Sequence, residues 1–252
     1  MMENWDTYLA RIGARGNTRR QTYMNRESRF INAKTPHTLS YFSVSIDGVE
    51  QDVAIINRDN LDEKWIYSLP GETLPLGGYV DWMDNHWLIT ELDANTELRY
   101  RAKMQQCNYL LRWIGEDLSI CEQWCIIEDG TKYLTGEFED RDFFTTRGDS
   151  RIAMTIARNN RTKLFDRQYR FLIDDPESEH MLAYALTKPL KLAGVFNNVG
   201  YYKFVLQEVN TTDDDNQQER IADYYKFFPS EKEIKPAPVP DQAPVGRQEV
   251  WL

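Results

Sequence analysis

Residues 76–128 read LGGYVDWMDNHWLITELDANTELRYRAKMQQCNYLLRWIGEDLSICEQWCIIE. Four of the chain's seven tryptophans lie here, beside Ile, Val, Leu and Tyr in short runs that turn residues separate. Aromatic and β-branched residues in short runs favour strands, so the stretch predicts a β-meander at the core of a β domain. One hairpin is expected to join residues 79–82 to 87–92 through the connection 83–86. A second should join residues 103–113 to 120–128.

The composition sets limits on the class of protein. The chain has 252 residues, enough for one large or two modest domains, and its character changes near residue 140, which favours two. Aromatic residues make up 13% of the chain, a content that suits sheets better than helical bundles. The formal net charge is −10, so the protein as a whole should not attract DNA, and any contact with nucleic acid must be local.

Cysteine usage and hydropathy indicate where the chain is made. The chain contains an odd number of cysteines, namely Cys107, Cys121 and Cys125. Its first residues contain no apolar run of signal-peptide length. These features predict a product made in the cytoplasm. No stretch approaches the roughly 18 consecutive apolar residues of a transmembrane helix, so no association with a membrane is expected.

Residues 1–37 predict an Arg-rich N-terminal arm. Gly13 and Gly16 are expected to interrupt any helix that starts near Trp5. The excess of positive charge would let the arm lie on an acidic partner or on nucleic acid. The alternative is a solvated, poorly ordered terminus. The arginines of the arm are Arg11, Arg15, Arg19, Arg20, Arg26 and Arg29.

Residues 38–135 predict a small antiparallel β-barrel or sandwich. Its clearest signal is the Asp47-Gly48 pair between two apolar runs, because Asp-Gly accepts the positive φ angles of a type I′ turn. That turn places Ile46 opposite Val49 and Phe42 opposite Val53. A further strand over residues 65–68 leads into the quoted stretch.

Residues 145–228 predict a second β domain. Apolar and polar residues alternate over Arg151–Ala157, and further strands are expected at 169–173, 181–186 and 201–209. Strands at this spacing with no helical period between them favour a second sandwich, immunoglobulin-like in architecture but without the Cys and Trp pattern of that family. The predicted fold class is therefore all-β, with extended terminal arms. Residues 221–228 could form a short helix or a last strand.

Residues 229–252 predict a Pro-rich C-terminal tail, with five prolines among residues 229–244. Trp251 near its end could dock on a neighbouring subunit, and a disordered end is the alternative.

The sequence contains few residues in patterns that are typical of catalysis. His37, His86 and His180 fit no sequence signature of a catalytic triad or of an HExxH zinc helix, and no phosphate-binding loop is present. A glycosidase needs a pair of carboxylates, and two among Asp81, Asp84, Glu91 and Asp93 could supply it, but nothing in the sequence singles out which two. The sequence therefore predicts no enzyme, with no catalytic residue and no cofactor.

Two clusters could hold a metal. The three cysteines lack the fourth ligand of a structural zinc site, so they are expected to be buried free thiols, with Cys107 near Cys125. Residues Asp213–Glu219 are dense in oxygen ligands but lack the glycine and spacing of an EF-hand loop, so cation binding by this acidic loop stays open. We assign no metal ligand.

Residues Leu76–Trp82, Trp87–Asp93 and Lys103–Trp113 resemble the head-closure or head-tail connector proteins of tailed bacteriophages and prophages, especially those of Gram-positive hosts. In these proteins a progression G-x-x-V-x-W, W-L-I-T and C-N-x-x-L-x-W belongs to a small β-barrel. The likeness covers residues 20–130, and residues 170–174 and 215–224 are similar to longer members with an added β domain.

The resemblance implies a virion structural protein of the phage neck, made in the host cytoplasm. Such a stopper is a homo-oligomeric ring, of about twelve or six subunits, whose interfaces close head to tail. Its partners would be the portal or adaptor protein on one side and a tail terminator or tail tube protein on the other. DNA would pass through its channel without sequence-specific binding, and the family transfers no enzymatic residue.

The residues expected to bind partners are Arg11, Arg15, Arg19 and Arg20 of the arm and Trp251 of the tail. The rival function is a carbohydrate-binding β-sandwich module of a phage tail or cell-wall protein, because exposed aromatic rings on a sheet can stack on sugars. A more remote alternative is a metal-dependent hydrolase that uses the acids of residues 213–219.

Overall fold

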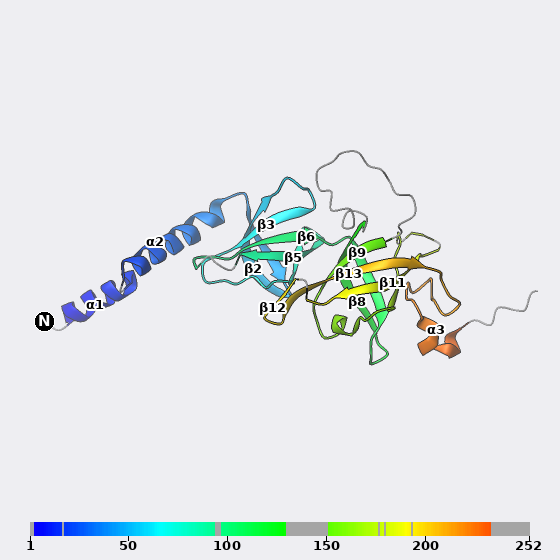
Figure 1. Ribbon diagram of the computed structural model, residues 1–252. Coiled ribbons are helices and arrows are strands. Elements are labelled where there is room, and N and C mark those ends of the chain that lie inside the picture. Colours follow the sequence, from blue (N-terminus) through cyan, green and yellow to red (C-terminus); the bar gives the residue numbers. More distant parts are fainter. Residues whose placement is uncertain are drawn as a thin grey trace, which may run out of the picture.

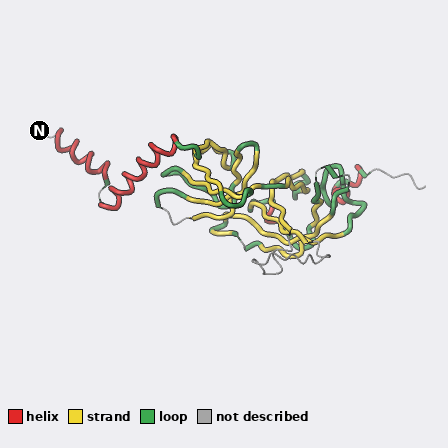
Figure 2. Tube along the Cα trace, turned by 90° about the horizontal axis from the view of Figure 1, so that it is seen from above, coloured by secondary structure: helices red, strands yellow, loops and turns green. Residues whose placement is uncertain are grey.

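The computed structural model describes residues 3–16, 18–93, 97–129, 151–175, 177–178, 180–192 and 194–232. Figure 1 shows three parts along one long axis: two helices at one end, a barrel in the middle, and a second sheet followed by a short helix at the other end. The view from above in Figure 2 gives the same order. The two sheets are antiparallel, which confirms the predicted all-β fold class.

The first sheet closes into a six-stranded barrel in the order β1-β2-β3-β6-β5-β4. The barrel closes because β4 also pairs with β1, with Ile46 opposite Val80. Closure leaves no free edge that could recruit another strand. The strands are β1 Tyr41–Ile46, β2 Val49–Asn57, β3 Glu63–Ser68, β4 Tyr79–Trp82, β5 Asn85–Asp93 and β6 Arg101–Gln106.

Turn chemistry sets the register of the barrel hairpins. Asp47 and Gly48 both have positive φ, and Phe42 pairs with Val53 and Ile46 with Val49, so the predicted register is confirmed. The β4–β5 turn is two residues long, shorter than the predicted connection 83–86. Met83 and Asp84 have φ angles of 49° and 59°, which suit a type I′ turn, so β5 can start at Asn85.

The second sheet runs β10-β11-β13-β9-β8-β7, with β12 paired to β13. It curls until its two edges approach, because the Tyr109 hydroxyl on β7 donates to the Leu172 carbonyl on β10 at 3.0 Å. Phe165, Phe171 and Phe204 are fully buried inside the curl. The strands are β7 Tyr109–Ile114, β8 Ile120–Asp129, β9 Arg151–Ala157, β10 Arg170–Leu172, β11 Ala183–Leu190, β12 Val195–Phe196 and β13 Val199–Val209.

The predicted domain boundary is wrong. The hairpin β7–β8 belongs to the second sheet, where β8 pairs with β9, and not to a barrel that extends over residues 38–135. The chain leaves the barrel at Cys107, whose N–H donates to the His86 carbonyl at 2.8 Å, and enters the second sheet at Asn108, whose N–H donates to Cys125. Because only these two residues separate β6 from β7, the sequence reads as one continuous strand. The limits at 135 and 145 lie outside the described residues.

The predicted N-terminal arm is helical. Helix α1 spans Glu3–Arg15 and continues through Gly13, so only Gly16, with a φ of 105°, interrupts it. Thr18 then caps helix α2, Arg19–Lys34, by accepting a hydrogen bond from the Gln21 N–H at 3.2 Å. A short 3₁₀ helix, η1 Thr35–His37, leads into β1. Near the other end, η3 Thr162–Leu164, α3 Tyr224–Phe227 and η4 Pro229–Glu231 complete the described elements, so the segment 221–228 contains a helix rather than a strand.

A seam joins the barrel to the second sheet through Tyr79 on β4. Its hydroxyl donates to the Trp124 carbonyl on β8 and accepts from the Gln123 amide at 3.0 Å and the Ala157 N–H at 3.4 Å. Burial raises the pKa of Tyr79 far above its ordinary value, so the hydroxyl stays neutral and keeps its donor. A buried cluster surrounds it, formed by Leu88, Cys107, Ile126 and Ala157 with Trp124 and Tyr201 packed against them.

The two backbones also touch at this seam. Gly77, which precedes β4, has a φ of 77°, and a Cβ added to it would lie 2.0 Å from the carbonyl oxygen of Gly200 on β13. No side chain fits at such a distance, so glycine at position 77 is what allows the barrel to reach the sheet.

Gly77→Ala should therefore destabilise the protein more than Gly48→Ala. Both positions have positive φ, which costs alanine about 1 kcal/mol, but a Cβ at Gly48 meets nothing within 4 Å. The clash with Gly200 should lower the free energy of unfolding by about 2 kcal/mol more, as overpacking does. Urea unfolding measures both variants, and equal losses would contradict the seam.

Candidate partner-binding surfaces

The two N-terminal helices present apolar side chains to solvent. On α1, Trp5 is 63% exposed and stacks on Tyr8 at a ring-centroid distance of 5.3 Å, with Leu9 on the same face. On α2, Tyr23 and Phe30 are also exposed, and no residue of this helix is buried. We call these five residues the arm stripe. Their spacing of three, four and seven residues is that of a helix face that packs on a partner.

The arm is attached to the barrel mainly at one end. Thr35, at the start of η1, is buried, and its carbonyl accepts a hydrogen bond from the Thr38 hydroxyl at 2.7 Å, just before β1. Further out, an ion pair joins Arg20 to Glu97, but both side chains are more than half exposed, so it contributes little. The helices therefore project from the barrel, as Figure 1 shows.

The structure places the four arm arginines predicted to bind partners at different points. Arg11 is exposed on α1, and Arg15 ends α1, where its side chain is outside the described residues. Arg19 lies over the Tyr23 ring at 5.8 Å, next to the arm stripe. Arg20 is engaged by Glu97. Trp251 lies outside the described residues.

Charge is divided unevenly between the arm and the rest of the chain. Residues 1–37 hold seven of the 30 basic residues and three of the 40 acidic ones, so their formal charge is +4 and that of the remainder is −14. A basic arm beside an acidic body favours an acidic surface as the arm's partner.

Sequence reasoning treated this segment as a charged arm and missed the arm stripe. The signal was present, because Trp5, Tyr8 and Leu9 already follow helical spacing. The expectation that Gly13 would break the helix hid it.

At the other end of the molecule, a buried ion-pair network fixes the acidic loop. The Arg170 guanidinium binds both carboxylate oxygens of Asp215, at 3.0 and 2.8 Å, and also Asp223 at 2.6 Å. The Asp215 side chain is fully buried, and it also accepts the N–H groups of Thr212 and Asp223. Because every oxygen of Asp215 has partners within the chain, this network holds the loop to β10.

The acids of residues 213–219 are therefore not gathered around a common point. Asp214 pairs with Lys232 at 2.8 Å, and Glu219 pairs with Arg112 at 3.0 Å. Among the described residues, no group of three or more His, Cys, Asp or Glu side chains could hold a metal ion.

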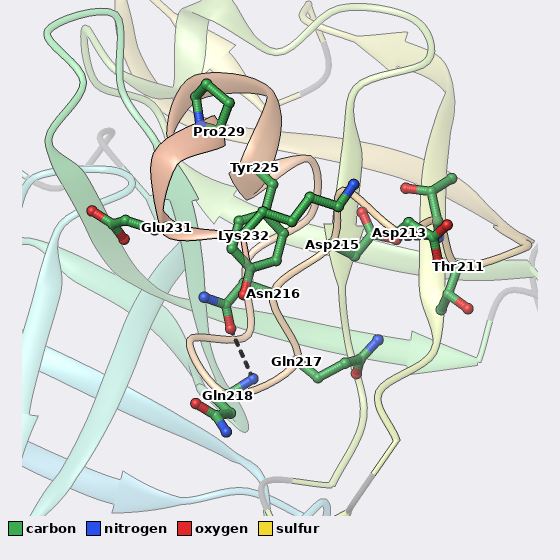
Figure 3. A pocket seen from close by; sticks show the side chains of 11 residues that line it. Thr211, Asp213, Asp215, Asn216, Gln217, Gln218, Tyr225, Pro229, Glu231 and Lys232 are labelled. Atoms are coloured by element: carbon green, nitrogen blue, oxygen red, sulfur yellow. Dashed lines mark hydrogen bonds between the residues drawn. The ribbon is translucent and has the colours of Figure 1, made fainter. Parts of the chain in front are cut away.

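A polar groove of about 830 Å³ lies beside this loop (Figure 3). Gln217, Gln218 and Asp213 line it from the loop, and Tyr225, Glu231 and Lys232 line it from the segment around α3 and η4. These groups can hydrogen-bond to a polar partner. The residues that line the groove include no histidine or cysteine that could act as a base or nucleophile.

The other candidate catalytic residues have structural partners. Asp81 lies 2.6 Å from His86, whose ring stacks on Trp124 at 4.5 Å, so both belong to the rim of the seam. Glu91 pairs with Lys103, and Asp93 lies 4.0 Å from Arg101 on the neighbouring strand. Asp84 lies in the β4–β5 turn. These contacts place the four carboxylates in separate pairs and a turn.

All three cysteines are free and buried, as predicted. Burial raises the pKa of Cys107 to about 12, with the Asp81 charge adding to the shift, and burial also raises that of Cys125. Cys107 is close enough to Cys125 to contribute to the latter shift, in line with the expected proximity. Thiols with such pKa values are packing groups rather than nucleophiles.

No family model matches the chain, and no curated protein sequence matches it. One solved structure is similar to the chain: "Structure of K. pneumonia MrkH in its apo state". The alignment covers 81% of this chain and 90% of the MrkH chain, with 11% sequence identity and a TM-score of 0.25. A TM-score at this level carries no inference about fold or function. Within the part of the chain that the structure describes, no helix is both long enough and apolar enough to cross a membrane.

Asp215→Asn should destabilise the protein because it removes the buried carboxylate that binds Arg170 through both oxygens and leaves Asp223 as the remaining carboxylate on that guanidinium. Breaking such a pair costs about 3 kcal/mol. The neighbouring Asp214→Asn is the matched control, since its pair with Lys232 is exposed and contributes little to stability. Urea unfolding distinguishes the two, and equal small losses would show that the network does not hold the loop.

Proposed function

We propose that this chain is a bacteriophage virion structural protein: a head-tail connector, of the head-closure or stopper kind, that forms a homo-oligomeric ring. It joins the portal or adaptor protein to the tail terminator or tail tube and continues the DNA channel. The observation that carries the proposal is the arm stripe, together with the resemblance of residues 76–113 to these proteins.

The arm stripe supports an assembly role because helices of this length need a packing partner. A helix of 13 or 16 residues is marginal in water, and most helical stability in proteins comes from burying an apolar face. Here the described side chains of α1 and α2 bury no such face within the chain. A protein surface that covers Trp5, Tyr8 and Leu9 would supply the missing contact.

The charge distribution supports passage of DNA rather than its capture. A body with a formal charge of −14 weakens contacts with phosphate, so DNA could slide along a wall formed by several copies. The basic arm would then serve protein contacts, since its stripe is aromatic and apolar between the arginines.

The shared seam favours a subunit that transmits force between its neighbours. A barrel and a sheet that share buried contacts at Tyr79, Gly77 and Gly200 would transmit force as one body. Such a body with unlike ends favours head-to-tail interfaces, which close into a ring when the rotation between copies allows it.

The triple variant Trp5→Ala, Tyr8→Ala, Leu9→Ala should abolish attachment to the portal or adaptor protein of the same phage. Loss of three central apolar contacts should raise the dissociation constant at least about 100-fold, as hot-spot truncations do. Pull-down with the purified portal or adaptor and negative-stain imaging of the complex measure attachment.

Leu61→Ala with Leu192→Ala is the matched control, because both side chains are exposed apolar groups that do not belong to the arm stripe. The control should attach as the unchanged protein does, and circular dichroism should show the same strand signal in all variants. Normal attachment of the triple variant would refute the role of the arm.

A further inference from the structure

An apolar groove of about 780 Å³ lies where the barrel meets the β12–β13 hairpin. Leu74 and Leu76 line it from the segment before β4, and Tyr100 lines it from the barrel. Phe196 and Val199, on the hairpin, face the same groove and are 66% and 55% exposed. A groove of this size with aromatic walls is typical of peptide recognition.

One polar group in this groove has no partner. Thr90 is only 7% exposed, and its hydroxyl forms no hydrogen bond within the described residues. Burying a hydroxyl without a partner is unfavourable, so an occupant that supplies a hydrogen-bonding group would recover part of that cost. The Thr90 hydroxyl therefore marks the point where an occupant of the groove would place a hydrogen-bonding group.

Residues 233–252 have the chemistry of such an occupant. The segment contains Pro236, Pro238, Pro240 and Pro244, followed by Val250, Trp251 and Leu252. Proline-rich segments favour the polyproline II conformation and dock in aromatic grooves, and an extended segment of this length spans about 60 Å. An indole ring matches the apolar walls, and its N–H is a donor that the Thr90 oxygen could accept.

We propose that the groove binds residues 233–252 of a second copy of this chain, with the Trp251 ring between Phe196 and Tyr100 and its N–H on the Thr90 hydroxyl. The second copy is favoured by position. The segment follows η4, which lies with α3 at the end of the second sheet away from the barrel, whereas β12 lies next to the barrel (Figure 1). A head-to-tail arrangement brings these unlike ends together. The proposal requires only that copies meet, whether or not the protein belongs to a phage.

Trp251→Ala and Val199→Asp should each weaken self-association of the full chain at least tenfold, measured by sedimentation velocity. Val49→Asp is the matched control, because Val49 is an exposed valine of another hairpin and does not line the groove. A mixture of the Trp251→Ala and Val199→Asp chains should recover association between unlike copies, since one keeps its groove and the other its Trp251. No recovery in the mixture would show that Trp251 of one copy does not bind the groove of another, and would overturn the proposal.

The Thr90 contact has a separate test. Thr90→Val removes the unpartnered hydroxyl, so the single chain should unfold at the same temperature or higher while self-association weakens. In a Trp251→Phe background, which lacks the indole N–H, Thr90→Val should have no further effect on association.

If Thr90→Val and Trp251→Phe weaken self-association independently, the proposed hydrogen bond does not form. A chain that stays monomeric at about 100 μM, where even weak complexes form, would overturn the docking itself.

Discussion

The close approach of two backbones at Gly77 and Gly200 is the constraint on which the rest of the structure depends. It brings Tyr79 within reach of Trp124 and Ala157, so one hydroxyl satisfies groups from both sheets. The barrel and the second sheet then share the buried cluster around Leu88 rather than forming separate cores. The barrel carries the arm and the second sheet carries the ion-pair network. Because the seam joins the two sheets, both features belong to one body.

The surfaces proposed for assembly are a projecting arm and a groove beside the seam. The arm stripe projects from the barrel, and the groove at the β12–β13 hairpin opens where the two sheets meet. Both have exposed apolar side chains, and both contain a group without a partner among the described residues. In the arm these are helices with no buried face, and in the groove it is the Thr90 hydroxyl. A monomer that functions alone would have little reason to keep either. The ring subunit that we propose, which binds unlike neighbours, would account for both.

Local signals carried most of what the sequence could predict. Asp47-Gly48 fixed the register of its hairpin, and the alternation over Arg151–Ala157 gave the bounds of β9. The crossing between sheets could not be predicted, because Cys107 and Asn108 include no glycine or proline that would end a strand between β6 and β7. The pairing of Arg170 with Asp215 joins residues 45 positions apart, and no local pattern reports such a contact. Thr90 reads as an ordinary strand residue, so the groove was equally hidden.

Hydrogen exchange of backbone amides in the isolated chain shows whether the seam unites the two sheets, since it reports the stability of each element separately. If the seam unites them, amides of β5 in the barrel and β13 in the second sheet exchange only through one shared opening. Amides of α2 should exchange orders of magnitude faster. Separate opening of the barrel and the second sheet, or an arm as protected as the strands in the monomer, would contradict this expectation.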